Sequence, residues 1–212
     1  MNVGVLVSGS GTNLQALIDR STRNELGAAR LTVVGSNVPD CQALSRARLA
    51  GLPTFLVDHR DHGDRAAFDR ALVEALRAHQ VDLVVLAGFM RVLSGELLDA
   101  FPGRVINIHP ALLPAFPGVH GVRQAYDAAV KIAGCTVHFV DRGVDTGPII
   151  AQAAVQLQDD DDDEALRARI LAEEHRLLPA VVRAIAERRV VVEGRRVRVL
   201  GAAPGNEPLR SL

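Results

Sequence analysis

Short apolar runs alternate with segments of helical spacing along the first half of the chain. Strands are predicted at 3–7, 31–36, 54–57, 81–87 and 105–108. Helices are predicted around 14–18, 43–50 and 68–76, where apolar residues recur every three or four positions. Strands that alternate with helices favour βαβ units and a parallel sheet, and a nearly continuous apolar run such as 81–87 is typical of a central strand covered on both faces.

The pattern of the second half is different. The predicted elements are a helix, two strands, a long amphipathic helix and a hairpin, at about 122–130, 135–140, 149–155, 166–185 and 190–200. A loop with two glycines joins the two strands, which we therefore expect to be antiparallel. The expected fold class is α/β, a Rossmann-like open, mostly parallel twisted sheet flanked by helices, with an antiparallel portion in the C-terminal half. We find no repeat or dividing linker, so we expect one domain over 1–200 and a flexible tail over 201–212.

Composition excludes several classes of function. The 212 residues are 48% hydrophobic and carry a net charge of −1, which provides no field for nucleic acid or an anionic membrane. Aromatic residues make up 3%, without tryptophan, so base-stacking platforms are not expected. No apolar run approaches the roughly 20 residues that cross a bilayer. The two distant cysteines, Cys41 and Cys135, lack metal-type spacing and suggest a reduced, cytoplasmic setting.

A glycine-rich segment, 8–13, follows the first predicted strand and precedes a helix. Backbone N–H groups at a helix start bind phosphate, and glycines let the anion approach closely. Leu14 stands where a dinucleotide-binding fingerprint has its third glycine, and no Gly-Lys-Ser/Thr follows. We expect a single phosphate held by Gly11, Thr12 and Asn13. A tight turn with an N-cap is the alternative.

Asn107 and His109 stand two residues apart at the end of the fifth predicted strand, so their side chains share one side. Pro110 ends that strand because it has no N–H to donate. An amide and a protonated imidazole together can stabilise an oxyanion during acyl transfer, and Asp145, in a glycine-flanked loop, would hold His109 in its charged form. The alternative is an Asn that caps a turn and a His bonded to backbone. The acidic run 159–163 is interpreted as a helix cap rather than a cation site, and the polar loop 58–64 as a solvated loop rather than a metal site.

The segment 107–114 resembles a signature of the folate-dependent formyltransferases, and 145–148 resembles the second signature of that family. Segments 8–15, 86–91 and 116–120 are similar to the branch that acts on glycinamide ribonucleotide. The resemblance covers about residues 1–200. Ala111 is a departure, since the family often has Ser there.

The resemblance implies transfer of the formyl group of 10-formyltetrahydrofolate, a co-substrate, to the amine of 5-phosphoribosylglycinamide in purine biosynthesis, with no metal. The catalytic residues would be Asn107, His109 and Asp145. The ribonucleotide would be bound by Gly11, Thr12, Asn13, Leu171, Ala172, Glu173 and Glu174. The folate would be bound by Arg65, Met90, Arg91, Val92, Leu93, Asn107, Asp141, Arg142, Gly143, Val144 and Asp145. The N-terminal half would bind phosphate, and the C-terminal half would bind folate and carry out catalysis. His138, on the strand beside the Asp145 loop, would be a supporting hydrogen-bond residue or belong to the core.

Three other functions stay open on the sequence: another 10-formyltetrahydrofolate-dependent formyltransferase, a formyltetrahydrofolate hydrolase, and a nucleotide-binding module without catalysis. A module would leave Asn107, His109 and Asp145 without a role. The expected partners are the two small-molecule substrates, with no nucleic acid and no membrane, and a homodimer is compatible with the sequence. The expected localisation is cytoplasmic.

Overall fold

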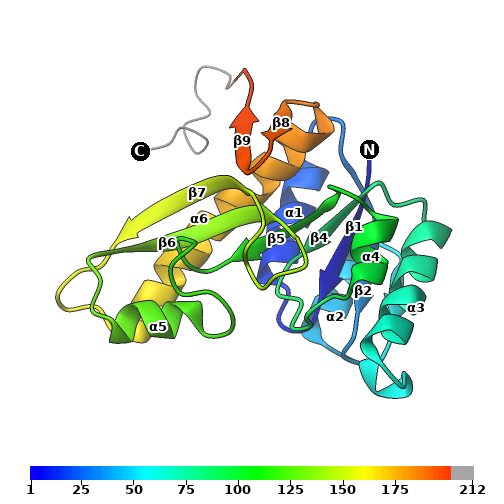
Figure 1. Cartoon of the computed structure of the whole chain (residues 1–212), viewed down its shortest axis with the longest axis horizontal. Helices are drawn as coiled ribbons and strands as arrows, with labels where there is room; N and C mark the ends of the chain where they lie inside the picture. Colours follow the sequence, from blue (N-terminus) through cyan, green and yellow to red (C-terminus); the bar gives the residue numbers. More distant parts are fainter. Residues whose placement is uncertain (202–212) are drawn as a thin grey trace. The chain divides into compact units, whose positions relative to one another are not determined.

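A computed structural model describes residues 1–201, so the predicted tail over 201–212 lies almost wholly outside the described residues. The chain divides into two compact units (Figure 1), one over Met1–Asn107 and one from Ile108 onward.

The first unit is built on parallel strands in the order β3-β2-β1-β4-β5. These strands are β1 Asn2–Val7, β2 Arg30–Ser36, β3 Thr54–Leu56, β4 Leu83–Leu86 and β5 Val105–His109, whose last two residues belong to the second unit. Every residue of β4 is buried, as its unbroken apolar sequence predicts. The predicted parallel βαβ arrangement is confirmed.

Helices connect these strands. They are α1 Thr12–Thr22, α2 Gln42–Leu49, the 3₁₀ turn η1 His59–Asp61, α3 Arg65–Ala78 and α4 Gly95–Ala100. α1 packs against α2, and α3 packs against α4. The Asp64 carboxylate accepts from the Ala67 N–H at 2.7 Å and so caps α3, while the Ser94 hydroxyl caps α4. These caps satisfy backbone donors that the helices themselves leave unpaired.

The second unit contains α5 Gly121–Asp127, β6 Ile132–Phe139, β7 Ile149–Gln156, α6 Asp163–Ala186, β8 Val190–Glu193 and β9 Arg196–Val199. β6 pairs with β7 and β8 with β9, both antiparallel, which confirms the expected antiparallel portion. α6 packs on β6, β7 and α5. The acidic run does cap a helix, because the Asp162 side chain accepts from the Ala165 N–H at 2.7 Å at the start of α6. Its neighbours also form ion pairs, for example Asp159 with Lys131 at 2.7 Å.

Several element bounds differ from the prediction. β6 begins three residues early, at Ile132, and α5 ends at Asp127 rather than near 130. The segment 58–64 is not wholly a loop, since Asp58 caps the 3₁₀ turn by accepting from the Arg60 N–H. α4 was not predicted, because six residues are too few to show a helical period.

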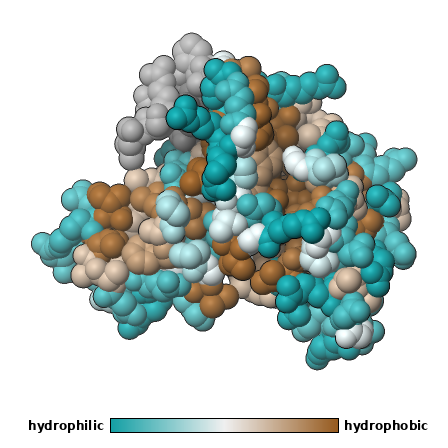
Figure 2. Space-filling model, in the orientation of Figure 1, coloured by the Kyte–Doolittle hydropathy of each residue, from teal (hydrophilic) through white to brown (hydrophobic). Residues whose placement is uncertain are grey.

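The surface is mixed, and Figure 2 shows hydrophilic residues with hydrophobic residues between them on one face. Large hydrophobic side chains that are at least half exposed include Leu49, Met90, Val92 and Val119. No helix within residues 1–201 is long and apolar enough to cross a membrane. Cys41 and Cys135 are both buried free thiols.

Candidate active site

His109 and Asp145 meet in the second unit. Nδ1 of His109, on β5, lies 3.3 Å from Oδ2 of Asp145, and both side chains are largely buried. The same Oδ2 accepts the backbone N–H of Gly118 at 2.8 Å. Nε2 of His138, on β6, lies 3.5 Å from the other carboxylate oxygen. The carboxylate therefore lies between two imidazole rings. His138 is buried and contacts Asp145, which is compatible with the predicted supporting role.

The electrostatics of this cluster favour an ionised Asp145. Burial by itself would raise the pKa of Asp145, but the hydrogen bonds from His138 and the Gly118 amide, with the nearby imidazole charges, bring that pKa below its usual value. A carboxylate buried at this depth is stable only because donors surround it.

Both ring nitrogens of His109 face acceptors. Nε2 lies 2.8 Å from the carbonyl oxygen of Phe116, and Nδ1 faces the Asp145 carboxylate. A neutral imidazole can donate to only one of them, so the protonated ring is the form that satisfies both. Phe116 and Asp145 have left-handed backbones, with φ of 56° and 55°. A Cβ on Gly121 would lie 3.2 Å from both His109 Nε2 and the Phe116 oxygen, so glycine lets the chain pass closely over this contact.

Asn107 lies on β5, two residues before His109, and pairs in register with Leu86 at the end of β4. It is partly buried, whereas His109 is 4% exposed. Alternate residues of a strand project to the same side, so β5 itself sets the spacing of this predicted pair. The glycine-rich segment after β1 and the loop after β4 lie at the carboxyl ends of strands adjacent in the first unit. That is where ligands bind in open α/β sheets.

The glycine-rich segment has the predicted geometry. Gly11 is the N-cap of α1, with φ 72°, and the first helical bond runs from the Gln15 N–H to the Gly11 carbonyl. The amides of Thr12, Asn13 and Leu14 therefore precede the helical ladder, as at any helix start. The structure adds a reason for Gly11 that the sequence did not indicate. A Cβ there would lie 2.5 Å from the Cβ of Ala43 on α2.

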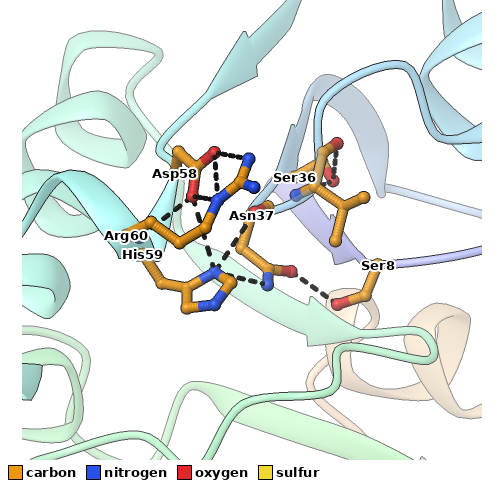
Figure 3. A network of polar contacts seen from close by, with 7 residues as sticks. Ser8, Ser36, Asn37, Asp58, His59 and Arg60 are labelled. Carbon is orange, nitrogen blue, oxygen red and sulfur yellow. Dashed lines mark hydrogen bonds and ion pairs between the residues drawn. The ribbon is translucent and has the colours of Figure 1, made fainter.

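Two predicted loops adopt defined shapes within their own units. In the second unit, Asp141 accepts from the Gly143 N–H at 3.0 Å and the Thr146 hydroxyl at 2.6 Å, which closes the 141–145 loop. In the first unit, the Ser8 hydroxyl accepts the Met90 N–H at 2.8 Å. Ser8 also joins a polar network, in which its hydroxyl donates to Asn37 and the Asn37 side chain reaches His59 (Figure 3).

The remaining predicted binding residues lie on two helices, α3 and α6. Arg65 is exposed at the first position of α3, and 171–174 lie in α6, where Glu174 is buried and the other three are not. Residues 1–201 contain no group of three or more His, Cys, Asp or Glu side chains arranged to hold a metal ion.

The prediction missed the carbonyl of Phe116 and the side chain of Asp69. A carbonyl has no sequence signature. Asp69 had one, because it occupies the apolar stripe of α3 three and four residues before Leu72 and Val73.

The family model for formyl transferases matches residues 1–182, and the chain belongs to the formyl transferase family. The phosphoribosylglycinamide formyltransferase of Mycobacterium tuberculosis is 49% identical over 191 residues, covering 90% of this chain and 87% of that protein. The crystal structure of glycinamide ribonucleotide transformylase 1 from Symbiobacterium toebii matches with 55% identity and a TM-score of 0.92 over 94% of each chain.

The trifunctional purine biosynthetic protein adenosine-3 of Drosophila melanogaster is 49% identical over 178 residues, or 84% of this chain. The chain spans 13% of the length of that protein.

Proposed function

We propose that the protein transfers the formyl group of 10-formyltetrahydrofolate to the amine of 5-phosphoribosylglycinamide. The observation that carries the proposal is the buried His109–Asp145 pair, with Asn107 on the same strand, in a member of the formyl transferase family. Relatives named phosphoribosylglycinamide formyltransferase support the choice of acceptor.

In the proposed reaction, the glycinamide nitrogen attacks the formyl carbon, and a carbon–nitrogen bond forms as the carbonyl oxygen becomes an oxyanion. Asn107 and protonated His109 donate hydrogen bonds to that oxygen. Asp145 stabilises the imidazolium from the opposite ring nitrogen. The intermediate then collapses, the bond from carbon to the folate nitrogen breaks, and the proton lost by the attacking amine goes to that leaving nitrogen.

The Phe116 contact fits this chemistry. The carbonyl oxygen of Phe116 already accepts from Nε2 of His109 at 2.8 Å. A developing oxyanion is a stronger acceptor than a peptide carbonyl, so it would take over this hydrogen bond in the transition state. The ring would keep its bond to Asp145 throughout.

Each part of the two substrates is matched to protein groups that could form hydrogen bonds or ion pairs with it. The amides at the start of α1, with Thr12 and Asn13, would bind the phosphate, and 171–174 on α6 would meet the rest of the ribonucleotide. Backbone groups of 90–93 and 141–145 would bind the pterin ring, and Arg65 the anionic glutamate tail of the folate.

The decisive experiment follows the absorbance change on loss of the 10-formyl group, with and without 5-phosphoribosylglycinamide. Loss that depends on the ribonucleotide supports the proposal. Loss without it would indicate a hydrolase, and nucleotide binding with no loss would indicate a binding module.

A further inference from the structure

Asp69 is a buried carboxylate on α3 that the proposed chemistry does not use. Its exposed fraction is 0%. Oδ2 accepts the Ser94 backbone N–H at 2.5 Å and the Ser94 hydroxyl at 2.8 Å. Within residues 1–201, Oδ1 is buried without a hydrogen-bond partner. Burial raises the pKa of Asp69, and the bonds from Ser94 offset only part of this effect. A polar atom left unsatisfied in the core calls for an explanation.

Ser94 is the last residue of the segment that joins β4 to α4, which we term the 88–94 loop. Ser8 holds the other end of this loop. The Ser8 N–H donates to the Gly88 carbonyl at 3.0 Å, and the Ser8 hydroxyl accepts the Met90 N–H at 2.8 Å. That hydroxyl donates in turn to Oδ1 of Asn37 at 2.6 Å, as Figure 3 shows. Asn37 is itself buried, so the direction of the Ser8 hydroxyl is fixed.

Between these attachments the 88–94 loop has no regular secondary structure. The Phe89 ring is buried and stacks on Phe68 of α3, with ring centroids 6.4 Å apart and planes 8° apart. Met90, Arg91 and Val92 are exposed. The loop therefore contacts α3 at two successive residues of that helix, Phe68 and Asp69, and presents Met90, Arg91 and Val92 to solvent, whereas Leu93 is buried.

We infer that Ser8 and Asp69 are positioning residues for the formyl donor, an inference that rests on the proposed function. Residues 90–93 form one proposed wall of the pterin site, and hydrogen bonds from their backbone groups to a planar heterocycle depend on the conformation of the loop. Fixing both ends of the loop before the donor arrives reduces the ordering entropy that binding must overcome. Asp69 also ties the loop to the helix that carries Arg65, one turn away, so two proposed donor contacts keep their spacing.

The test compares Asp69→Ala with Asp69→Asn in steady-state kinetics. Alanine removes the acceptor of both Ser94 bonds, so the donor KM should rise roughly tenfold while the ribonucleotide KM stays within about twofold. Asparagine keeps an oxygen that can accept from Ser94 and should restore most of the donor KM. Asp82→Ala is the matched control, because Asp82 accepts the Asn2 backbone N–H at 2.8 Å at the opposite end of β4.

Amide hydrogen exchange gives a readout that does not depend on folate. Exchange at Ser94 should accelerate in Asp69→Ala, and exchange at Met90 should accelerate in Ser8→Ala. If both KM values rise equally, or if the donor KM is unchanged while exchange accelerates, the inference is overturned. If Asp69→Ala does not fold, the donor KM of Ser8→Ala and Asp69→Asn decides in the same way. A wild-type protein without formyl transfer would instead overturn the proposed function.

Discussion

Nδ1 of His109 lies 3.3 Å from Oδ2 of Asp145, although the two residues come from β5 and from the loop after β6. The Asp145 oxygen also accepts the Gly118 amide, so the carboxylate is fixed on its side of the pair. A fixed, ionised carboxylate next to an imidazole stabilises the protonated ring without reorganising during the reaction.

Asp145→Asn should lower kcat by roughly 10²-fold or more, the scale expected when one preorganised electrostatic group is lost. The ribonucleotide KM should change little, because the phosphate is assigned to α1. Asp127→Asn is a suitable control, since Asp127 is exposed and forms a surface ion pair with Arg123 at 2.9 Å. An Asp145→Asn variant with wild-type kcat would remove Asp145 from the mechanism.

The pH dependence of stability should also report on Asp145. Its pKa is lowered in the folded protein, chiefly because the bonds from His138 and Gly118 outweigh burial. Its ionised form therefore adds stability above the unfolded pKa of about 3.9, and this contribution is lost as pH falls through the lowered folded value. The difference in free energy of unfolding between wild type and Asp145→Asn should be large near neutral pH, and it should shrink progressively as pH falls from about 4 through the lowered folded pKa. Urea unfolding at a series of pH values measures it, and a difference independent of pH would contradict the prediction.

Arg65→Ala should weaken binding of the formyl donor and leave ribonucleotide affinity nearly unchanged. The side chain is exposed, so we expect a loss of about 0.2–1 kcal/mol, a severalfold change in affinity. Titration calorimetry with a folate analogue measures this. Arg70→Ala is the matched control on the same helix, where Arg70 pairs with Glu96 at 3.0 Å. Equal losses in the two variants would show that Arg65 has no special contact with the donor.

Thr12→Val should raise the ribonucleotide KM by roughly tenfold, because it removes one hydroxyl donor to a charged phosphate. The KM for the formyl donor should stay nearly unchanged. Gly11 is a poor target for this test, since any side chain there would collide with Ala43. Thr22→Val, at the other end of α1, makes the same chemical change at a site where the hydroxyl bonds only locally, to the Asp19 carbonyl. If the two variants behave alike, the phosphate is not bound at Thr12.

Much of the fold could be predicted from the sequence because its signals are local. The buried strand β4 is a run of apolar residues, and the cap of α6 is an Asp at the start of a helical pattern. The proximity of Asp145 to His109 was also expected, from a glycine-flanked loop and a resemblance to known signatures. The catalytic and binding roles of these residues remain predictions until the variants above are measured.

What could not be predicted depends on contacts between distant segments. Position 11 requires glycine because any Cβ there would collide with Ala43. The oxygen that accepts from Nε2 of His109 belongs to a backbone carbonyl, which any residue would supply. Asp69 shows the intermediate case. Its place on an apolar helix face marked it as unusual, but its partner, Ser94, follows a strand and a loop later.

The left-handed backbones of Phe116 and Asp145 set a limit on engineering this protein for heat resistance. Each non-glycine residue in that region carries about 1–3 kcal/mol of strain. A glycine scan guided only by unfolding temperature would therefore be drawn to these two positions. Glycine at position 116 would keep the carbonyl but give it more conformational freedom, and glycine at position 145 would remove the carboxylate that the His109 ring faces. Glycine variants chosen at these positions for heat resistance alone would therefore weaken or remove contacts of one buried imidazole.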